Sequence, residues 1–355
     1  MELQNTIDQA IDILRRWELG DTLFSLTTSG STGEPTTIEH SRAALQWSAE
    51  STLNTWFTHS NQPEDNTPLA PIQLCILPLN KAGGFMQLIR SAVWNAPIWI
   101  APASANPLTE SELALIKNGE VIPFSPELWN QYKPNILSIT PMQLQLALKS
   151  ETGHEILNQM HTGLIGGQAM DLQLEKQILE VFPNTRWIHT FGSTETASHF
   201  AGRILNHNTA EYTLTAGSTL NTNESGEIQI SNPATNGRRI TLHDKIHQTS
   251  DTTFVWLERT NLLVNSGGVK IPIEPLEKEI AQLLNWPLMS FYIAGQPHPI
   301  LGEELTLFTT HSINDMQRII ATLDQLPKLH QPKKILFISE ITISNNGKIV
   351  RKINP

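Results

Sequence analysis

Short apolar runs that alternate with helix-like segments constrain this chain more than any other feature. LCILPL at 74–79, PIWIAP at 97–102 and ILSITP at 136–141 are each the size of a strand, and each is followed by turn residues or a helical pattern. This order is typical of a mainly parallel sheet covered by helices. The sequence therefore predicts an α/β fold class.

Two changes in the pattern of apolar residues along the sequence predict how the chain divides into domains. From about Gly226 the runs become shorter and alternate apolar with polar residues, which favours a small antiparallel or mixed subdomain. After a hinge near residues 259–265, helix and strand patterns alternate again over about 95 residues, which is within the usual size of a domain. We therefore expect an N-terminal domain of residues 1–258 and a mobile C-terminal α+β domain of residues 259–355.

Composition argues against several classes of partner. The chain has 24 basic and 34 acidic residues and a net charge of −10, whereas a broad surface for nucleic acid or anionic membrane needs a basic face. The apolar runs stop short of the roughly 20 residues of a membrane span. Residues 1–20 indicate an amphipathic helix rather than an export signal. The one cysteine, Cys75, lies in an apolar run, so we expect a buried thiol and a cytoplasmic protein.

The stretch TTSGSTGEP at 27–35 follows a strand-like run and is rich in glycine and hydroxyl side chains. Such a loop can turn several N–H and O–H groups toward one anion, and Gly30 and Gly33 permit a close backbone approach. An ordinary solvated loop is the alternative interpretation. The G-x-x-x-x-G-K-[ST] and G-x-G-x-x-G phosphate motifs are both absent.

The same stretch and several later ones, in order, resemble the motifs of the AMP-forming acyl-CoA synthetase and adenylation-domain superfamily. The later stretches are GGQAM at 166–170, TFGSTETAS at 190–198, LHD at 242–244 with FVWLER ending at Arg259, NSGGVK at 265–270 and NGKIVRK at 346–352. The resemblance implies an adenylate-forming α/β fold with layered sheets, truncated at the N-terminus, and a small α+β domain after it. It also implies that an acid attacks ATP to form an acyl-adenylate, with Mg²⁺ and coenzyme A taking part.

The resemblance implies three groups of ATP-binding residues. The loop would hold the β and γ phosphates through Thr28, Ser29, Gly30, Ser31, Thr32 and Gly33. The adenine would lie near Gly167, Phe191 and Gly192, with a core position as the alternative for Phe191. Asp244 would accept from the ribose, assisted by Arg259, because the family separates these two residues by 15 positions, as this chain does. Asp251 lies only 8 positions before Arg259 and matches less well.

Catalytic roles also follow from the resemblance. Thr194 would donate to the α-phosphate, and Glu195 would hold Mg²⁺, which neutralises the triphosphate. Lys348 would bridge the carboxylate and α-phosphate oxygens and supply positive charge where negative charge accumulates. The C-terminal domain would then rotate and present a face to the thiol of coenzyme A. That face comprises Ser266, Gly267 and Gly268.

Three further stretches are ETASHFAGRIL at 195–205, FVWLERTNLLVNSGGVKI at 254–271 and LPLNKAGGFMQLIRSAV at 77–93. With these stretches and its compact form, the chain resembles most the small o-succinylbenzoate-CoA ligases of menaquinone synthesis. Their substrate keeps a second carboxylate, which needs a cation or hydrogen-bond donors when it is buried. The candidates for holding that carboxylate are Lys81, Arg90, Ser198 and His199. For Arg90, a surface partner of an acidic side chain is the alternative.

Two other functions stay open. One is an AMP-forming ligase for another aromatic or short carboxylic acid, and the other is a nucleotide-binding relative without catalysis. Thr36, where the family has Lys, motivates the second, and Asn261 at the hinge is a further departure. The expected partners are small molecules, namely the acid, ATP and coenzyme A, with no nucleic acid and no membrane. The sequence leaves the oligomeric state open, a homodimer included.

Overall fold

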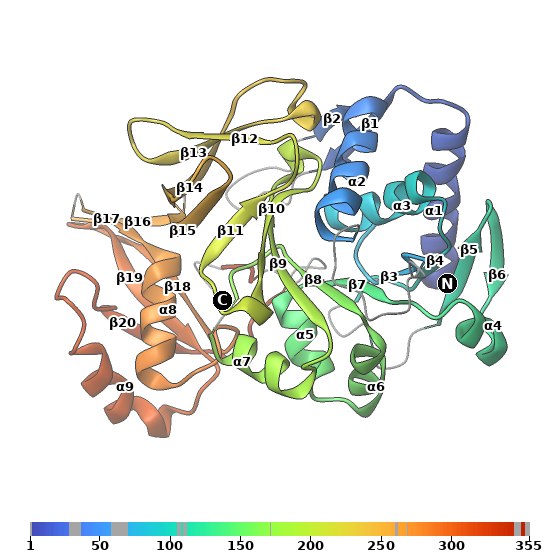
Figure 1. The fold of residues 1–355 in the computed structure, drawn as a ribbon. Coiled ribbons are helices and arrows are strands. Elements are labelled where there is room, and N and C mark those ends of the chain that lie inside the picture. The colour runs from blue at the N-terminus through green and yellow to red at the C-terminus, as the bar shows by residue number, and fades with distance from the viewer. Residues whose placement is uncertain are drawn as a thin grey trace.

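The computed structural model describes residues 2–27, 37–57, 70–104, 108, 112–170, 172–259, 262–267, 269–343 and 349–351. Its centre is a parallel sheet buried on both faces (Figure 1). In spatial order, the parallel strands are β4 (Ile98–Ile100), β3 (Gln73–Cys75), β7 (Ile136–Ile139), β8 (Thr162–Ile165) and β9 (Arg186–Gly192). The apolar runs at 74–79, 97–102 and 136–141 each overlap one of these strands, and the predicted α/β fold class is confirmed.

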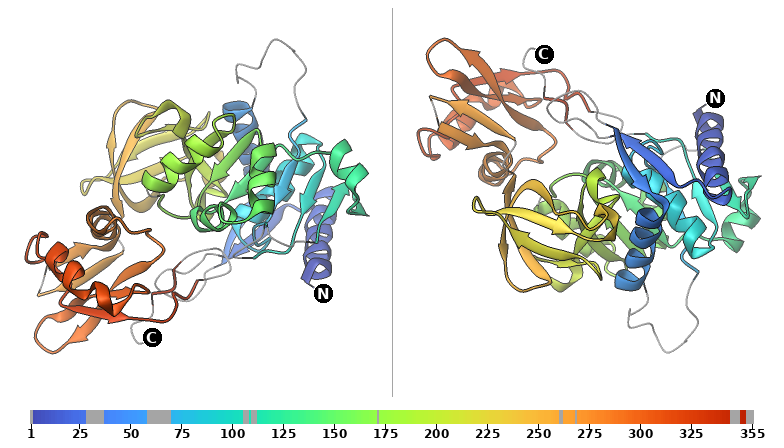
Figure 2. Two further views of the ribbon diagram at one scale, coloured as in Figure 1. Left: turned by 90° about the horizontal axis from the view of Figure 1, so that it is seen from below. Right: turned by 90° about the horizontal axis from the view of Figure 1, so that it is seen from above.

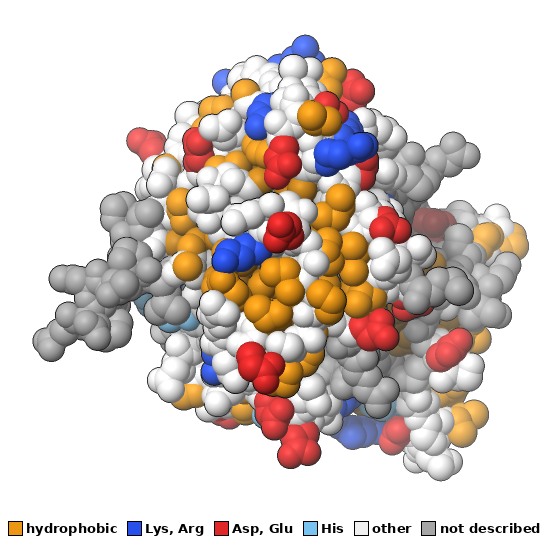
Figure 3. All heavy atoms as spheres, turned by 90° about the vertical axis from the view of Figure 1, so that its right-hand side faces the viewer, with side chains coloured by type: hydrophobic (Ala, Val, Ile, Leu, Met, Phe, Trp, Pro, Cys, Tyr) orange, Lys and Arg blue, Asp and Glu red, His pale blue; other side chains and the backbone are white. Residues whose placement is uncertain are grey.

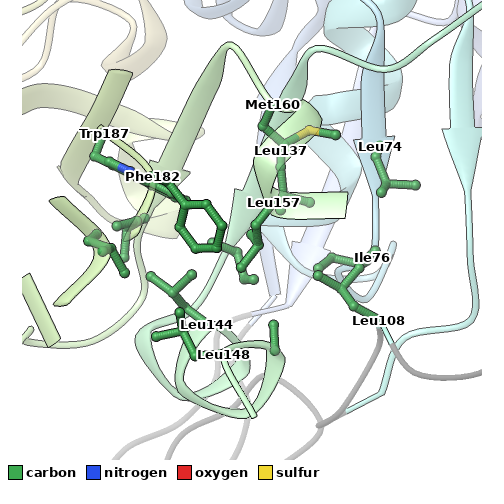
Figure 4. Packing of buried hydrophobic residues seen from close by; sticks show 14 of the residues in the cluster. Leu74, Ile76, Leu108, Leu137, Leu144, Leu148, Leu157, Met160, Phe182 and Trp187 are labelled. Atoms are coloured by element: carbon green, nitrogen blue, oxygen red, sulfur yellow. The ribbon is translucent and has the colours of Figure 1, made fainter. Parts of the chain in front are cut away.

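Helices cover both faces of this parallel sheet (Figure 2). One face carries α5 (Pro141–Ala147), α6 (Glu151–Gln159) and α7 (Leu172–Val181), and the other carries α1 (Glu2–Glu18) and α3 (Ala82–Trp94). Successive side chains of a strand point to opposite faces. Leu74 therefore packs with α5, α6 and α7, whereas Cys75 packs with α1 and α3. Figure 4 shows the first of these two cores, in which the rings of Phe182 and Trp187 lie 6.2 Å apart.

The sheet continues beyond β9 as antiparallel strands. In spatial order these are β10 (His199–Ile204), β11 (Glu211–Leu214), β15 (Thr253–Arg259), β14 (Ile240–Gln248), β13 (Glu227–Ser231) and β12 (Thr219–Thr222). The short alternating strands predicted from Gly226 are present, since β13 alternates buried with half-buried residues. Antiparallel pairing already begins at β10, however, and all of these strands belong to one sheet, which has 13 strands within the described ranges. The predicted subdomain is thus an extension of the main sheet.

The opposite edge of the sheet ends in β5 (Ala114–Lys117) and β6 (Glu120–Pro123), which are followed by α4 (Pro126–Gln131). A groove of about 790 Å³ runs between α1 and this edge. Ile7, Ile11 and Val121 are among its lining residues, and Figure 3 shows hydrophobic side chains gathered on this side of the molecule. None of the site residues predicted from the sequence is among the described residues that line it.

The predicted amphipathic helix at the N-terminus is α1, which buries three apolar side chains. After it, β1 (Leu23–Thr27) and β2 (Thr37–Ser41) form an antiparallel hairpin in which Thr27 lies opposite Thr37. The helix α2 (Arg42–Trp56) follows directly. The predicted phosphate loop is therefore bounded on both sides by paired strands.

The C-terminal part has a sheet and a core of its own. Its elements are β16 (Leu263–Ser266), β17 (Val269–Pro272), α8 (Ile273–Leu284), β18 (Phe291–His298), β19 (Gly302–Thr309), α9 (Met316–Leu323) and β20 (Lys334–Phe337). We call these elements, with residues 349–351, the C-terminal module. Its helix α8 buries Leu276 and Ile280 against strand residues such as Phe291. The break between the two sheets falls after Arg259, and the division into domains of residues 1–258 and 259–355 stays a prediction.

Four single turns of 3-10 helix complete the described elements. They are η1 (Thr194–Thr196), η2 (Leu205–His207), η3 (Pro233–Thr235) and η4 (Ile313–Asp315). In the described ranges, none of the helices combines the length and apolar character that a membrane crossing requires.

Cys75 lies between the sheet and the helices α1 and α3 and is 1% exposed. Burial raises the pKa of its thiol to about 12. The side chain is thus the buried thiol that the sequence predicts, and it stays protonated at neutral pH.

Candidate nucleotide and acid site

The β1–β2 hairpin fixes both ends of the predicted phosphate loop. The six residues assigned to phosphate binding, Thr28, Ser29, Gly30, Ser31, Thr32 and Gly33, lie outside the described residues, as does Thr36. At the base of the loop, the Nζ atom of Lys81 donates to the carbonyl oxygen of Thr27 across 3.3 Å. Lys81 was predicted with Arg90, but the two are nine residues apart along α3, a rise of about 13 Å.

The Thr194–Glu195 pair lies in η1, immediately beyond the end of β9. The turn is folded tightly, because a Cβ atom added at Gly192 would lie 2.3 Å from the carbonyl oxygen of Ser198. Ala197 closes the turn with a φ of +62°, a conformation that residues other than glycine seldom adopt. Its side chain is fully buried, so packing supports this strained backbone.

His40 links this turn to the loop hairpin. It lies on β2, is buried, and donates from Nε2 to the carbonyl oxygen of Thr194 across 2.7 Å. Burial lowers the pKa of His40, although the Thr194 carbonyl and the charge of Glu195 act in the opposite direction. The sequence analysis missed this residue, because TIEHS at 37–41 carries no recognisable motif.

Phe191 lies on β9 and is half-buried. Its ring packs edge-on against Phe200, Tyr212 and Phe254, with centroids 5.5 to 5.6 Å apart. The ring is therefore part of an aromatic cluster, as the alternative interpretation expected, while part of its surface stays open. Its role as an adenine contact stays a prediction.

His189 holds the turn that contains Gly167. Gly167 has a φ of +83°, and the carbonyl oxygen of the next residue, Gln168, lies 3.1 Å from Nε2 of His189. Burial lowers the pKa of His189 to about 4, so the ring is neutral. Its Nε2–H then donates to Gln168, and its Nδ1 accepts from the hydroxyl of Tyr212 across 2.7 Å. Neither His189 nor Tyr212 was identified from the sequence.

Asp244 and Arg259 face each other across the β14–β15 ladder. Both are half-buried, and the Nε1 atom of Trp256 donates to Asp244 Oδ1 across 2.9 Å. Asp251 is exposed in the turn between the two strands. It does not pair with Arg259 in the ladder.

Arg90, Ser198 and His199, three of the four predicted acid contacts, lie together in the structure. Arg90 is 2% exposed, and its Nη2 atom lies 2.7 Å from Ser198 Oγ and 3.4 Å from His199 Nδ1. Burial lowers the pKa of Arg90 to about 10. In the part of the chain that the structure describes, no carboxylate pairs with this guanidinium, and its Nε has no hydrogen-bond partner. The surface ion pair considered as an alternative is therefore not seen.

His199 extends this cluster to α2. Burial, with a contribution from the charge of Arg90, lowers the pKa of His199 well below its usual value. The neutral ring accepts from Arg90 at Nδ1 and donates from Nε2 to Thr52 Oγ1 across 3.1 Å. Thr52 in turn donates to the carbonyl oxygen of Ser48 across 2.8 Å. The ring of His199, which accepts from Arg90, is thus held in place by α2.

The predicted coenzyme A and lysine positions lie on the C-terminal module. Ser266 ends β16, and Gly267 follows with a φ of +60° and a backbone bond to Leu301 of 2.8 Å. Gly268, Asn261 and Lys348 lie outside the described residues. Three positions after Lys348 in the sequence, Arg351 donates to the buried Glu277 across 2.7 Å.

Glu195 is the predicted ligand for Mg²⁺. Among the described residues, no group of three or more His, Cys, Asp or Glu side chains gathers in one place. Mg²⁺ is commonly held by one or two carboxylates together with substrate phosphates and water. Glu195, one residue after Thr194, is a carboxylate of this kind.

Known proteins resemble this chain in sequence and in fold. Residues 7–237 match the family described as AMP-binding enzyme. A 2-succinylbenzoate–CoA ligase of Listeria monocytogenes is 24% identical over 381 residues, covering 99% of this chain and 73% of that protein. An acyl-CoA synthetase (AMP-forming)/AMP-acid ligase II-like protein from Dyadobacter fermentans is 26% identical, with a TM-score of 0.57 over 96% of this chain and 91% of that one.

A further solved structure resembles the fold. The o-succinylbenzoate coenzyme A synthetase of Bacillus subtilis, in complex with ATP and magnesium ion, has a TM-score of 0.63 at 16% identity. The likeness covers 91% of this chain and 68% of that one. The family match spans more than half of the chain and confirms the resemblance found in its motifs. The chain belongs to the AMP-binding enzyme family.

Proposed function

We propose that this protein is an AMP-forming ligase that activates 2-succinylbenzoate and transfers it to coenzyme A, in menaquinone biosynthesis. A carboxylate oxygen of the acid bonds to the α-phosphorus of ATP, and the bond to pyrophosphate breaks. The thiol of coenzyme A then attacks the acyl carbonyl, and AMP leaves. Membership of the family and the name of the Listeria relative support this reaction.

The buried guanidinium of Arg90 is the observation that most supports 2-succinylbenzoate as the acid. A charge removed from water without an ionic partner is costly, so an anionic ligand at this position would be strongly favoured. The second carboxylate of 2-succinylbenzoate would supply that anion. The hydroxyl of Ser198 and the ring of His199 lie beside it. Lys81, at Thr27, is the least supported of the four predicted acid contacts.

The nucleotide would occupy the predicted ATP-binding residues. The phosphates would lie in the loop, the adenine near Gly167, Phe191 and Gly192, and the ribose at Asp244 and Arg259. Thr194 would donate to the α-phosphate, and His40 would hold its backbone in place. Mg²⁺, held by Glu195, would offset the charge of the triphosphate.

The two predicted domains would have different roles in the reaction. Residues 1–258 would bind ATP and the acid, and residues 259–355 would carry Lys348 for adenylation. The C-terminal domain would also present Ser266, Gly267 and Gly268 to coenzyme A. Because ATP and coenzyme A are the expected substrates, we also expect a cytoplasmic location, and a homodimer stays a prediction.

Pyrophosphate release with ATP and a panel of acids tests this proposal. The panel contains 2-succinylbenzoate, benzoate and short aliphatic acids, and ATP binding is measured in parallel. Strict dependence on 2-succinylbenzoate supports the proposal, whereas preference for another acid supports the wider ligase assignment. Binding of ATP without release for any acid supports a non-catalytic relative.

An Arg90→Gln variant then tests the acid contact. We expect its KM for 2-succinylbenzoate to rise at least tenfold, because a charge-assisted hydrogen bond is lost. The KM for ATP should stay the same. Arg186→Gln is the control, since Arg186 is another arginine partly removed from water, but it is only half-buried and bonds to the backbone of Trp56.

A further inference from the structure

We propose that Trp256 is a positioning residue for the ribose-binding carboxylate, and that Lys278 makes this positioning depend on where the C-terminal module lies. The inference rests on the proposed function, because it takes Asp244 as the ribose contact. It goes beyond that function because neither Trp256 nor Lys278 was assigned a role from the sequence: Trp256 lies in the stretch FVWLER, of which only Arg259 was given one.

A bulge in β15 places Trp256 on the face of Asp244. Lys245 pairs with Glu258, but the next residue, Ile246, pairs with Trp256, so Leu257 is an extra residue in the ladder. In a regular ladder Ile246 would face Leu257, and Trp256 would point to the opposite side of the sheet. The extra residue turns the indole toward Asp244, as bulges next to functional sites often do.

The hydrogen bond, rather than packing, explains why a tryptophan stands here. The ring packs partly buried against the aromatic and aliphatic cluster that contains Ile246 and Phe254, a contact that phenylalanine could also make. Only tryptophan adds an N–H that reaches Asp244 Oδ1, at 2.9 Å. With Oδ1 held, the carboxylate has one orientation, and its Oδ2 stays available to accept from ribose hydroxyls.

Lys278, on the C-terminal module, lies over the same ring. It lies on α8, and its Nζ atom is 4.0 Å from the centre of the Trp256 ring. Burial lowers the pKa of Lys278, so its ammonium group is partly removed from water, where its attraction to the ring is strengthened. A second contact joins the same parts of the molecule, because Gln173 on α7 donates to Asn285 at the end of α8.

The chain Lys278–Trp256–Asp244 thus connects a cation of the module to the carboxylate of the ribose site. If α8 moved away, the ring would lose its cation and its restraint on that side. Asp244 would then be held by a less restrained donor. We therefore expect the orientation of the module in this structure to favour binding of the nucleotide through its ribose hydroxyls.

The experiment compares Mg·ATP with Mg·2′,3′-dideoxy-ATP, which lacks both ribose hydroxyls, by calorimetry without any acid. We expect Trp256→Phe to weaken ATP binding about tenfold, the size of one hydrogen bond to a charged group, and to leave dideoxy-ATP binding unchanged. Trp94→Phe is the matched control. Trp94 is also half-buried, and its ring nitrogen donates to the backbone oxygen of Ala49. The Trp94→Phe variant should bind both nucleotides as the unmodified protein does.

Two further variants separate the possible failures. Asp244→Asn should lose the preference for ATP over dideoxy-ATP; if it keeps the preference, the assignment of Asp244 in the proposed function is wrong. If Asp244→Asn loses the preference but Trp256→Phe keeps it, or weakens both nucleotides equally, the positioning role is overturned. Lys278→Met keeps the aliphatic stem and should lower the preference about threefold. An unchanged preference in that variant would overturn the link to the module.

Discussion

The imidazole of His40 and the carbonyl oxygen of Thr194 are 154 positions apart in the chain and form a hydrogen bond of 2.7 Å. This bond joins the strand that follows the phosphate loop to the turn that carries Thr194 and Glu195. The two parts of the site that would contact the triphosphate are therefore held together by a side chain that contacts neither ATP nor the acid in our assignment.

Replacing His40 should affect turnover more than acid binding. In His40→Ala the carbonyl of Thr194 loses its donor, and we expect kcat for pyrophosphate release to fall about tenfold, as for the loss of one buried hydrogen bond. The KM for the acid should change less than twofold. His40→Gln can still donate and should recover part of the rate. Full turnover in His40→Ala, at unchanged thermal stability, would count against the link.

Arg90 should strengthen the binding of 2-succinylbenzoate but lower the stability of the protein without ligand. Arg90→Met removes a buried charge that has no acidic partner among the described residues, so we expect the free energy of unfolding to rise by about 1–3 kcal/mol. Binding of 2-succinylbenzoate should be lost in the same variant. Urea denaturation at constant m-value measures the first effect. A large loss of stability would instead show that Arg90 has a structural role.

The stability of the protein should depend on pH through His189. Its pKa falls from 6.5 to about 4 on folding, because burial disfavours the charged ring. The contribution is complete above pH 6.5 and is lost as the pH falls toward 4, since only the unfolded chain then takes up a proton. Between these two pH values, the free energy of unfolding should fall by roughly 3 kcal/mol through His189 alone. The pKa values of His40 and His199 are also lowered by burial, so these residues contribute to the same pH dependence. The test therefore compares the free energy of unfolding, measured as a function of pH, of the unmodified protein and of His189→Gln. Parallel curves would refute the assignment.

Gly192 should tolerate no side chain. A Cβ atom there would lie 2.3 Å from the Ser198 carbonyl oxygen and 2.4 Å from the Cα of His199, so the backbone must shift. We expect Gly192→Ala to lower the free energy of unfolding by about 1–3 kcal/mol and to impair both turnover and acid binding. Gly83→Ala is the control, because its new Cβ would contact only a flexible side-chain atom of Leu77, at 3.1 Å. Equal stability of the two variants would contradict the argument.

The pair of Glu277 and Arg351 should matter for adenylation and not for ATP affinity. Glu277 is buried and accepts from both Arg351 and the backbone N–H of Ile293, each across 2.7 Å. Glu277→Gln weakens the anchor of the segment next to Lys348, so kcat should fall severalfold while binding of ATP is unchanged. Glu258→Gln, which removes a more exposed ion pair with Lys245, should have little effect on kcat. A loss of ATP affinity in Glu277→Gln would argue for a different role.

The parallel sheet was predictable because its strands are buried on both faces and read as continuous apolar runs. Arg90, Ser198 and His199 could be grouped from the resemblance, and the structure brings them together. Positioning residues were not predictable. Their partners lie far away in the chain, and a bulge such as that at Leu257 changes which side chains share a face without leaving a local signal.

The single cysteine has a practical consequence for following the C-terminal module. With its thiol buried and its pKa raised to about 12, Cys75 has almost no thiolate to react with maleimides while the protein is folded. Two cysteines introduced on exposed surfaces, one at Leu283 on α8 and one at Val181 on α7, could then carry a fluorescent pair without removal of the native residue. Energy transfer between the dyes would report how far apart the two helices lie during each half of the reaction.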